Sequence, residues 1–170
     1  MRAGLLLTDD LERELDFHHR AVLVAHRDCH VLALPAVQAH RVRLAPDMKP
    51  VIYQVQSACD YVNAAAAWLS GQVPPKHEDN EQTIGDARAR IQKTVAFAES
   101  VREAQYAGAS DRKIGLSWAP GKHLGGKDYL LQMTIPNVYF QVAIAYAILR
   151  HNGVDIGKMD FLGPINWIDA

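Results

Sequence analysis

Two amide side chains, Asn137 and Gln141, lie among apolar residues in the stretch PNVYFQVAIAYAILRHNG, residues 136–153. In an α-helix, a spacing of four residues places both side chains on one face, together with apolar residues one and two turns later. A buried amide without a partner costs roughly 1 to 3 kcal/mol, so each amide needs a hydrogen bond across the helices or a wet cavity. Two explanations therefore stay open, a structural hydrogen bond and a ligand pocket.

A second group of residues with metal-binding potential is the stretch HRDCH, in which His26 and His30 lie four residues apart beside Cys29. On a helix, this pair could bind zinc or nickel, which accept imidazole nitrogen and thiolate. A third ligand would be required, and the sequence specifies none. The alternative is a pair of polar histidines that face solvent.

Cys59 and Asp60, in the stretch QSACDY, are candidates for a nucleophile and a carboxylate base. Cys59 lies next to a stripe of apolar residues, so we expect it to be a small buried side chain. Asp60 shares a helix face with Gln56 and Asn63. That face is either a polar surface or the wall of a pocket.

The composition favours one soluble domain, because the chain has 170 residues of which 49% are hydrophobic and 22% charged. The formal net charge of -1 gives no field that would attract nucleic acid or an anionic membrane, so neither is an expected partner. The N-terminal leucine run is too short for a signal peptide or a membrane span. With only two cysteines, the chain is expected to be cytoplasmic and free of disulfides.

The elements that position these residues follow from periodicity. A helix is predicted over residues 47–70, with Asp47 as its N-cap and Gly71 as its stop. Its apolar stripe consists of Val51, Val55, Ala58, Val62, Ala65 and Leu69. Two consecutive prolines predict a loop over residues 73–80.

A second helix is predicted over residues 81–105, with a capping box between Thr83 and Asp86. Its apolar face consists of Ile84, Ala87, Ile91, Val95, Ala98 and Val101. The opposite face carries charged side chains and is expected to be solvated; these are Arg88, Arg90, Lys93 and Glu99.

A small hairpin or extended flap is predicted next, because Ile114, Leu116 and Trp118 recur at every second position, a turn follows, and a return strand can begin at Leu124. The last long helix is expected from residue 128 to residue 152, either kinked at Pro136 or restarted there.

Both ends of the chain carry further apolar sequence. The tail after residue 153 should pack onto the body or onto a partner subunit. A further amphipathic helix, capped by Thr8 and reaching Cys29, would bring the number of main helices to four.

Over about Arg43 to Gly163, the chain resembles an uncharacterised branch of the DinB/YfiT-like superfamily, a domain of unknown function. The resemblance rests on the motifs LAPDM, QVQSACD, PNVYFQ and YAILRHNGV. It implies an all-α, DinB-like four-helix bundle with a short β-hairpin or flap before the last helix, frequently as a homodimer. Better-known relatives hold a divalent metal with three histidines, and some are thiol-dependent transferases or hydrolases.

The resemblance places the histidine pair of the last helix at Asn137 and Gln141, and the ligand of the second helix within residues 57–61, where this chain has no histidine. Amide oxygens are poor ligands for zinc or nickel, so no tightly bound transition metal is expected, and a weakly held or lost divalent metal is the alternative. Residues 1–40 do not resemble the branch, which suggests either a misread start of the gene or real divergence.

The sequence thus predicts a single helical-bundle domain that binds a small molecule or serves a structural role, with a degenerate metal site and no cofactor. The predicted pocket is lined by Gln54, Ser57, Asp60, Asn137 and Gln141. A homodimer and a small-molecule ligand are the expected partners. The alternative is a transferase or hydrolase of the superfamily type that uses a weakly held metal, or Asp60 as a base.

Overall fold

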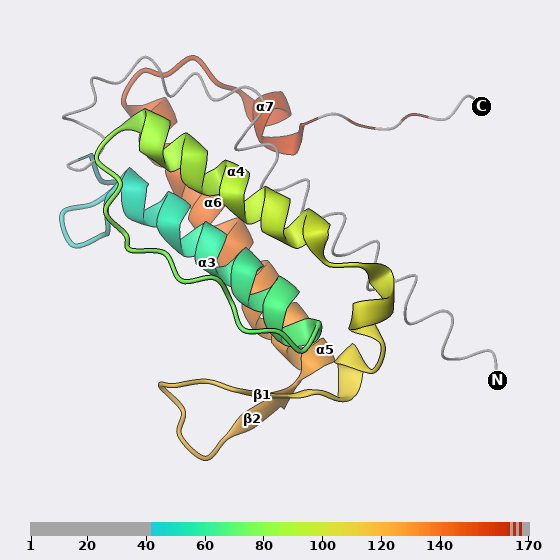
Figure 1. The fold of residues 1–170 in the computed structure, drawn as a ribbon. Coiled ribbons are helices and arrows are strands. Elements are labelled where there is room, and N and C mark those ends of the chain that lie inside the picture. The colour runs from blue at the N-terminus through green and yellow to red at the C-terminus, as the bar shows by residue number, and fades with distance from the viewer. Residues whose placement is uncertain (1–41, 164, 166, 168–170) are drawn as a thin grey trace.

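The computed structural model describes residues 42–163, 165 and 167. Within this part of the chain, three long helices lie side by side, α3 (Val51–Leu69), α4 (Ile84–Ser100) and α6 (Ile135–His151) (Figure 1). Helix α3 packs against both of the others. The helix expected near the N-terminus lies outside the described residues, and so do His26, Cys29 and His30.

Helix α3 is buried over much of its circumference because it packs against two helices. Of the predicted stripe, Val55 is half-buried and the other five residues are buried. The predicted N-cap at Asp47 is wrong, because the helix begins at Val51 with extended Pro50 at its N-cap and no side-chain cap. A proline disfavours helical backbone in the residue before it, which prevents an earlier start. Gly71 ends the helix with a φ of 77°, as predicted.

Helix α4 begins with the predicted capping box. The backbone N–H of Asp86 donates to Thr83 Oγ1 at 3.1 Å, and that of Thr83 donates to Asp86 Oδ2 at 2.8 Å. The predicted end near residue 105 is wrong, because α4 ends at Ser100 and a separate short 3₁₀ turn follows, η2 (Glu103–Tyr106). The Ser100 hydroxyl donates to the carbonyl of Phe97 at 2.7 Å, a local bond that competes with continued helix.

The predicted hairpin is present as two short antiparallel strands, β1 (Lys113–Gly115) and β2 (His123–Gly125), with Ile114 opposite Leu124. Trp118, expected in the first strand, lies in the connecting loop and is 70% exposed. The hairpin leads into α5 (Gly126–Asp128), which packs against η3 (Ala109–Asp111). A Cβ at Gly126 would lie 1.9 Å from the carbonyl oxygen of Ala109, so only glycine permits this approach.

The chain stays helical from α5 through the π-helical segment η4 (Tyr129–Thr134) into α6. The departure from α-helical geometry therefore comes just before Pro136, where the sequence predicted a kink or a restart. Proline has no N–H for the carbonyl four residues earlier, and the wider π turn changes the bonding pattern at that point. Gly153 follows α6 with a φ of 85°, which confirms the predicted stop.

The core consists of three clusters that follow one another along α3 and α6. The first joins Val51 to Ile148, Leu149 and Val154; the second joins Cys59 and Val62 to Ile91 and Val138; the third joins Leu69 to Ile114, Tyr129 and Leu130. This order shows that α3 and α6 are antiparallel.

Part of the C-terminal tail packs onto the body, which was one of the two predicted alternatives. The short helix α7 (Lys158–Leu162) places Phe161 edge-on against Tyr146 of α6, with ring centroids 6.0 Å apart. Other apolar side chains in the tail are exposed, including Met159 and Trp167.

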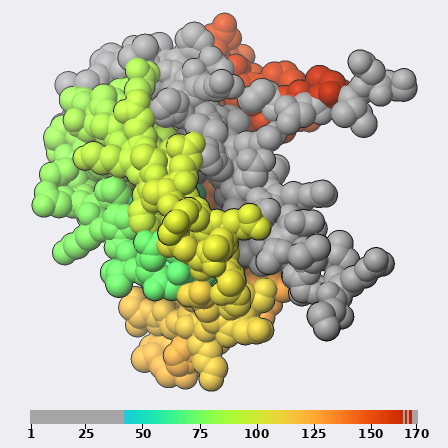
Figure 2. All heavy atoms as spheres, turned by 45° about the vertical axis from the view of Figure 1, so that its right-hand side comes forward, coloured from blue at the N-terminus to red at the C-terminus, as the bar shows by residue number. Residues whose placement is uncertain are grey.

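The described chain is an all-α helical bundle with a short hairpin before the last long helix, as predicted. Figure 2 shows α4 along one face of the body, with the hairpin region at one end. No helix in the described residues has the length and apolar character needed to cross a membrane.

Candidate functional site

The two glutamines of the predicted pocket are buried, and each has an oxygen without a partner among the described residues. Gln54 of α3 is 3% exposed and Gln141 of α6 is 8% exposed. The amide nitrogen of Gln54 donates to the Lys49 carbonyl at 3.0 Å, which leaves its Oε1 without a hydrogen bond. Gln141 Oε1 is likewise buried and unpartnered. Both positions therefore offer a buried hydrogen-bond acceptor.

Asn137 has a local role instead. Its amide nitrogen donates to the carbonyl of Met133 at 2.6 Å, one turn earlier and inside the π-helical segment η4. Such a bond supports the backbone where the π turn meets Pro136. The structural explanation therefore applies to Asn137, whereas nothing in the described part of the chain explains Gln141 in this way.

Asp60 and Ser57 lie on the outer part of α3. Ser57 is half-buried, and the Asp60 side chain is 53% exposed. The Asp60 carboxylate accepts a hydrogen bond from Arg90 Nη2 at 2.6 Å, which pairs it with α4 rather than with the amides of α6. Among the described residues, no hydrogen bond joins any two of the five predicted pocket residues.

Arg90 is the centre of a carboxylate cluster that the sequence did not predict. The Arg90 side chain is only 2% exposed, so the expectation that it lies on a solvated face is wrong. Its Nη1 donates to Asp79 Oδ1 at 2.6 Å and to Glu81 Oε1 at 2.9 Å, in addition to the Asp60 bond. Asp79 and Glu81 belong to the α3–α4 loop (residues 70–83), which runs back along α3 to the start of α4 (Figure 1) and pairs with the arginine.

The cluster fixes the conformation of this loop. Asp79 has a φ of 52°, a left-handed backbone that aspartate adopts more readily than most residues other than glycine. Glu81 is fixed from both sides, because Gln56 Nε2 donates to its Oε2 at 2.7 Å while Arg90 binds its other oxygen. Burial acts to raise the pKa of Glu81, but these hydrogen bonds hold it below its ordinary value. Burial raises the pKa of Asp60, against the charge of Arg90.

A second polar chain leads from the core to the same loop. Asn63 of α3 is 1% exposed, and its Nδ2 lies 2.8 Å from His77 Nε2 and 3.4 Å from Thr94 Oγ1. Thr94 in turn hydrogen-bonds with the Cys59 thiol. Burial raises the pKa of that thiol to about 11, against this hydrogen bond and the charge of Arg90, so Cys59 is a poor nucleophile.

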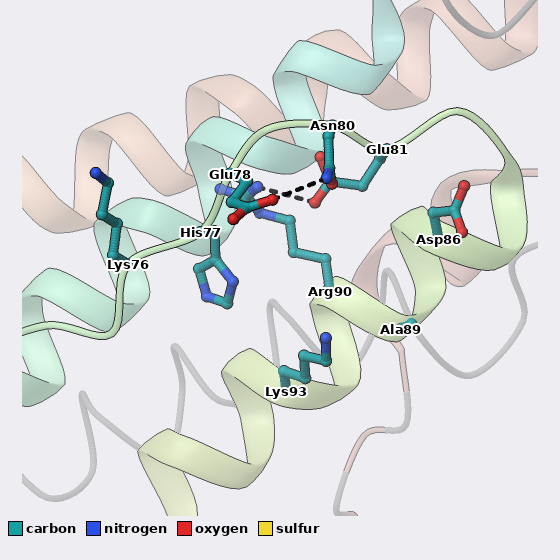
Figure 3. A pocket seen from close by; sticks show the side chains of 9 residues that line it. All are labelled: Lys76, His77, Glu78, Asn80, Glu81, Asp86, Ala89, Arg90 and Lys93. Carbon is teal, nitrogen blue, oxygen red and sulfur yellow. Dashed lines mark hydrogen bonds and ion pairs between the residues drawn. The ribbon is translucent and has the colours of Figure 1, made fainter.

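A cleft of about 570 Å³ lies between the α3–α4 loop and α4, and we call it the polar cleft (Figure 3). Its lining is charged or polar apart from one alanine; it consists of Lys76, His77, Glu78, Asn80, Glu81, Asp86, Ala89, Arg90 and Lys93. None of the five predicted pocket residues lines this cleft. It is therefore a second location, separate from the buried glutamines.

Residues 22–162 match a family described as "Domain of unknown function (DUF1993)". The chain belongs to this family. A solved structure of a DinB family member protein from Shewanella denitrificans is 33% identical, with a TM-score of 0.78, and the match covers 98% of this chain and 97% of that one. The comparison with curated proteins finds no match. The predicted resemblance to a DinB-like branch of unknown function is thereby confirmed, and the family match begins well before residue 43.

Among the described residues, the side chains at the positions that the resemblance assigns to the histidine pair do not suit the three-histidine metal of better-known DinB-like proteins. At the two positions assigned to the histidine pair, Asn137 uses its amide nitrogen on a backbone carbonyl and Gln141 offers only an amide oxygen. Among the described residues, no group of three or more histidine, cysteine, aspartate or glutamate side chains could hold a metal ion. Zinc and nickel prefer imidazole or thiolate to an amide oxygen.

Sequence reasoning placed Gln56 and Asn63 on one polar face with Asp60, but it missed Thr94 and the loop residues that these side chains contact. One signal was present for Asn63 and Thr94. Each is adjacent in sequence to a residue of the apolar stripe of its helix, so a stripe one residue wider would have included both. His77, Asp79 and Glu81 lie in an irregular loop, so periodicity could not place them. The burial of Arg90 depends on the path of that loop and had no local signal.

Proposed function

We propose that this DUF1993 protein is a small-molecule-binding helical bundle, in which Gln141 takes the place of a metal ligand and accepts a hydrogen bond from a polar ligand. The observation that carries the proposal is the buried Oε1 of Gln141, which has no partner among the described residues. The resemblance to DinB-like proteins assigns a metal ligand to this position. Folding leaves this oxygen without water and without a partner in the described part of the chain.

The energetic argument supports a ligand. An unpartnered buried amide costs roughly 1 to 3 kcal/mol, and a ligand that donates a hydrogen bond would recover part of this cost on binding. Gln54 Oε1 is a second acceptor of the same kind on the facing helix. Asn63, by comparison, hydrogen-bonds across the helices to Thr94 through its amide nitrogen, although its Oδ1 is also buried without a partner among the described residues. The ligand class is therefore a small molecule with N–H or O–H donors.

The alternative of a metal-dependent transferase or hydrolase has weaker support. The amides at the former histidine positions are unsuited to zinc or nickel, and Asp60 is paired with Arg90 at 2.6 Å. Burial raises the pKa of Asp60, but a substrate would have to displace Arg90 from this carboxylate before Asp60 could accept its proton. Neither route to catalysis has a favourable arrangement among the described residues.

The proposal is tested by native mass spectrometry and metal analysis of protein purified without an affinity tag. The expected result for the wild type is a bound small molecule without stoichiometric zinc or nickel, and Gln141→Met should lose that molecule. Gln92→Met, at an exposed position of α4, is the matched control and should keep it. Stoichiometric zinc or nickel in the wild type, or an unchanged adduct in Gln141→Met, would contradict the proposal.

The cellular setting and assembly belong to the same proposal. We place the protein in the cytoplasm, from its two cysteines, and expect a homodimer, from the resemblance to DinB-like proteins. Light scattering on the purified chain measures the mass of the assembly, and a mass equal to the 18.9 kDa chain would contradict the dimer.

A further inference from the structure

Helix α6 is apolar on every side, although one of its faces is in solvent. From Ile135 to Leu149 it has no charged residue, and its two amides, Asn137 and Gln141, are half-buried and buried. A surface helix normally presents polar residues opposite its core-facing stripe, and a helix without them is normally covered on all sides. Among the described elements, α6 makes most of its contacts with α3 and η4. Its outer face therefore has the composition of an interface.

The exposed side of α6 forms one row that begins in α5 and η4. Its members follow one another at spacings of three, four or seven residues, which fall on one helix face. We call them the α6 outer row; all six are exposed, and they are Asp128, Gln132, Pro136, Phe140, Ala143 and Arg150. Phe140 is 54% exposed and belongs to none of the three core clusters of the described residues. A large apolar side chain thus lies in solvent at the middle of the row.

The two ends of the α6 outer row carry opposite charges. Asp128 precedes Phe140 by twelve residues and Arg150 follows it by ten, and every residue between Asp128 and Arg150 is uncharged. Asp128 accepts from the neutral amide of Gln132 at 3.0 Å, which also places these two side chains on the same side of η4. Arg150 lies 3.4 Å from the carboxylate of exposed Asp155, and exposed pairs of this kind are weak. Both end charges can therefore pair with a partner.

We propose that the α6 outer row is the interface between two copies of this chain. The two α6 helices run antiparallel about a two-fold axis at Phe140, so that Asp128 of each copy pairs with Arg150 of the other. A two-fold interface uses the same patch on both copies, and a patch with an acid at one end and a base at the other is complementary to itself in this orientation. The inference rests on the homodimer of the proposed function and locates its interface.

The charge pattern is the reason for a second copy as the occupant. In the antiparallel pair the contact between Asp128 and Arg150 occurs twice, and the positive end of each helix dipole lies beside the negative end of the other. Phe140 then meets its own copy at the centre of the interface, where a buried aromatic side chain contributes most to binding. The small side chain of Ala143, one turn later, lets the two helices approach closely.

Sedimentation velocity over a range of protein concentrations tests the interface. The wild type should sediment as a dimer. Phe140→Glu and Ala143→Glu should each raise the dissociation constant of the dimer about a hundredfold or more, because the two-fold axis brings two buried carboxylates together. Trp118→Glu is the matched control, since Trp118 is an exposed aromatic residue outside the row, and it should leave the dimer unchanged. Thermal unfolding of each variant checks that it is folded.

A charge exchange tests the antiparallel orientation. Asp128→Arg and Arg150→Asp should each weaken the dimer about tenfold, because each places like charges opposite one another at both ends of the interface. The variant that carries both substitutions restores both pairs and should dimerise as the wild type does. No recovery in the double variant would contradict the antiparallel arrangement.

The outcomes separate this inference from the proposed function. A dimer that persists in both Phe140→Glu and Ala143→Glu, or that is lost in Trp118→Glu, would overturn the interface and leave the homodimer standing. A wild type with the mass of one chain at all concentrations would overturn both, as it would if another segment of the same chain covered the row. Gln141→Met should dimerise as the wild type does, so loss of the small-molecule site is read independently in native mass spectrometry.

Discussion

Replacement of Gln141 by methionine should stabilise the ligand-free protein. Gln141 is 8% exposed and its Oε1 has no partner in the described part of the chain, which corresponds to a penalty of about 1 to 3 kcal/mol. Methionine has a similar length and is also a good helix former, so packing should change by less than about 1.5 kcal/mol. The expected net effect is a gain of about 1 kcal/mol in the free energy of unfolding.

Urea unfolding followed by circular dichroism measures this gain, and a thermal midpoint raised by roughly 2 to 4 °C should accompany it in a chain of this size. Asn137→Leu, one turn earlier, should have the opposite sign. It removes the 2.6 Å bond to the Met133 carbonyl and should cost about 1 kcal/mol. If the free energy of unfolding of Gln141→Met is instead lower than that of the wild type by about 1 kcal/mol or more, with an unchanged m-value, the amide was satisfied in the folded protein. That result would refute the reasoning.

Two further predictions concern the α3–α4 contact. Arg90→Met should lower the free energy of unfolding by about 3 kcal/mol or more, because buried Glu81 loses its cation. The control Arg88→Met should change it by no more than about 0.5 kcal/mol. Equal losses of stability for the two variants in urea unfolding would contradict this prediction. Folding raises the pKa of Cys59 from 9.0 to about 11, so its thiol contributes stability that is complete below pH 9 and is lost as the pH rises toward 11. The advantage of the wild type over Cys59→Ala should therefore shrink by about 1 kcal/mol per pH unit over that range, and a constant difference would exclude the effect.

The regular elements were predictable because their signals are local. The apolar stripe of α3, the Thr83–Asp86 capping box and the glycines after α3 and α6 each act within a few residues, and each prediction is confirmed. The errors lie at boundaries. Pro50 determined the start of α3 in place of Asp47, and α4 ends at Ser100, whose hydroxyl donates to the carbonyl of Phe97.

The candidate sites were less predictable, because they depend on contacts between distant residues. Asn137 and Gln141 looked equivalent from their spacing, yet the π-helical segment before Pro136 gives Asn137 a backbone partner, and Gln141 Oε1 has none among the described residues. The burial of Arg90 follows from a loop that brings Asp79 and Glu81 over α4. No periodic pattern encodes the path of that loop.

The central claim, that Gln141 is an acceptor for a small-molecule ligand, is tested most directly by comparing ligand affinities of the wild type and Gln141→Met. Calorimetry against a defined panel of small alcohols, amides and amines provides the comparison. We predict at least one saturable ligand for the wild type, bound about tenfold more weakly by Gln141→Met, as expected for one lost hydrogen bond of about 1.4 kcal/mol. Equal affinities in the two proteins, or no ligand for the wild type, would contradict the claim.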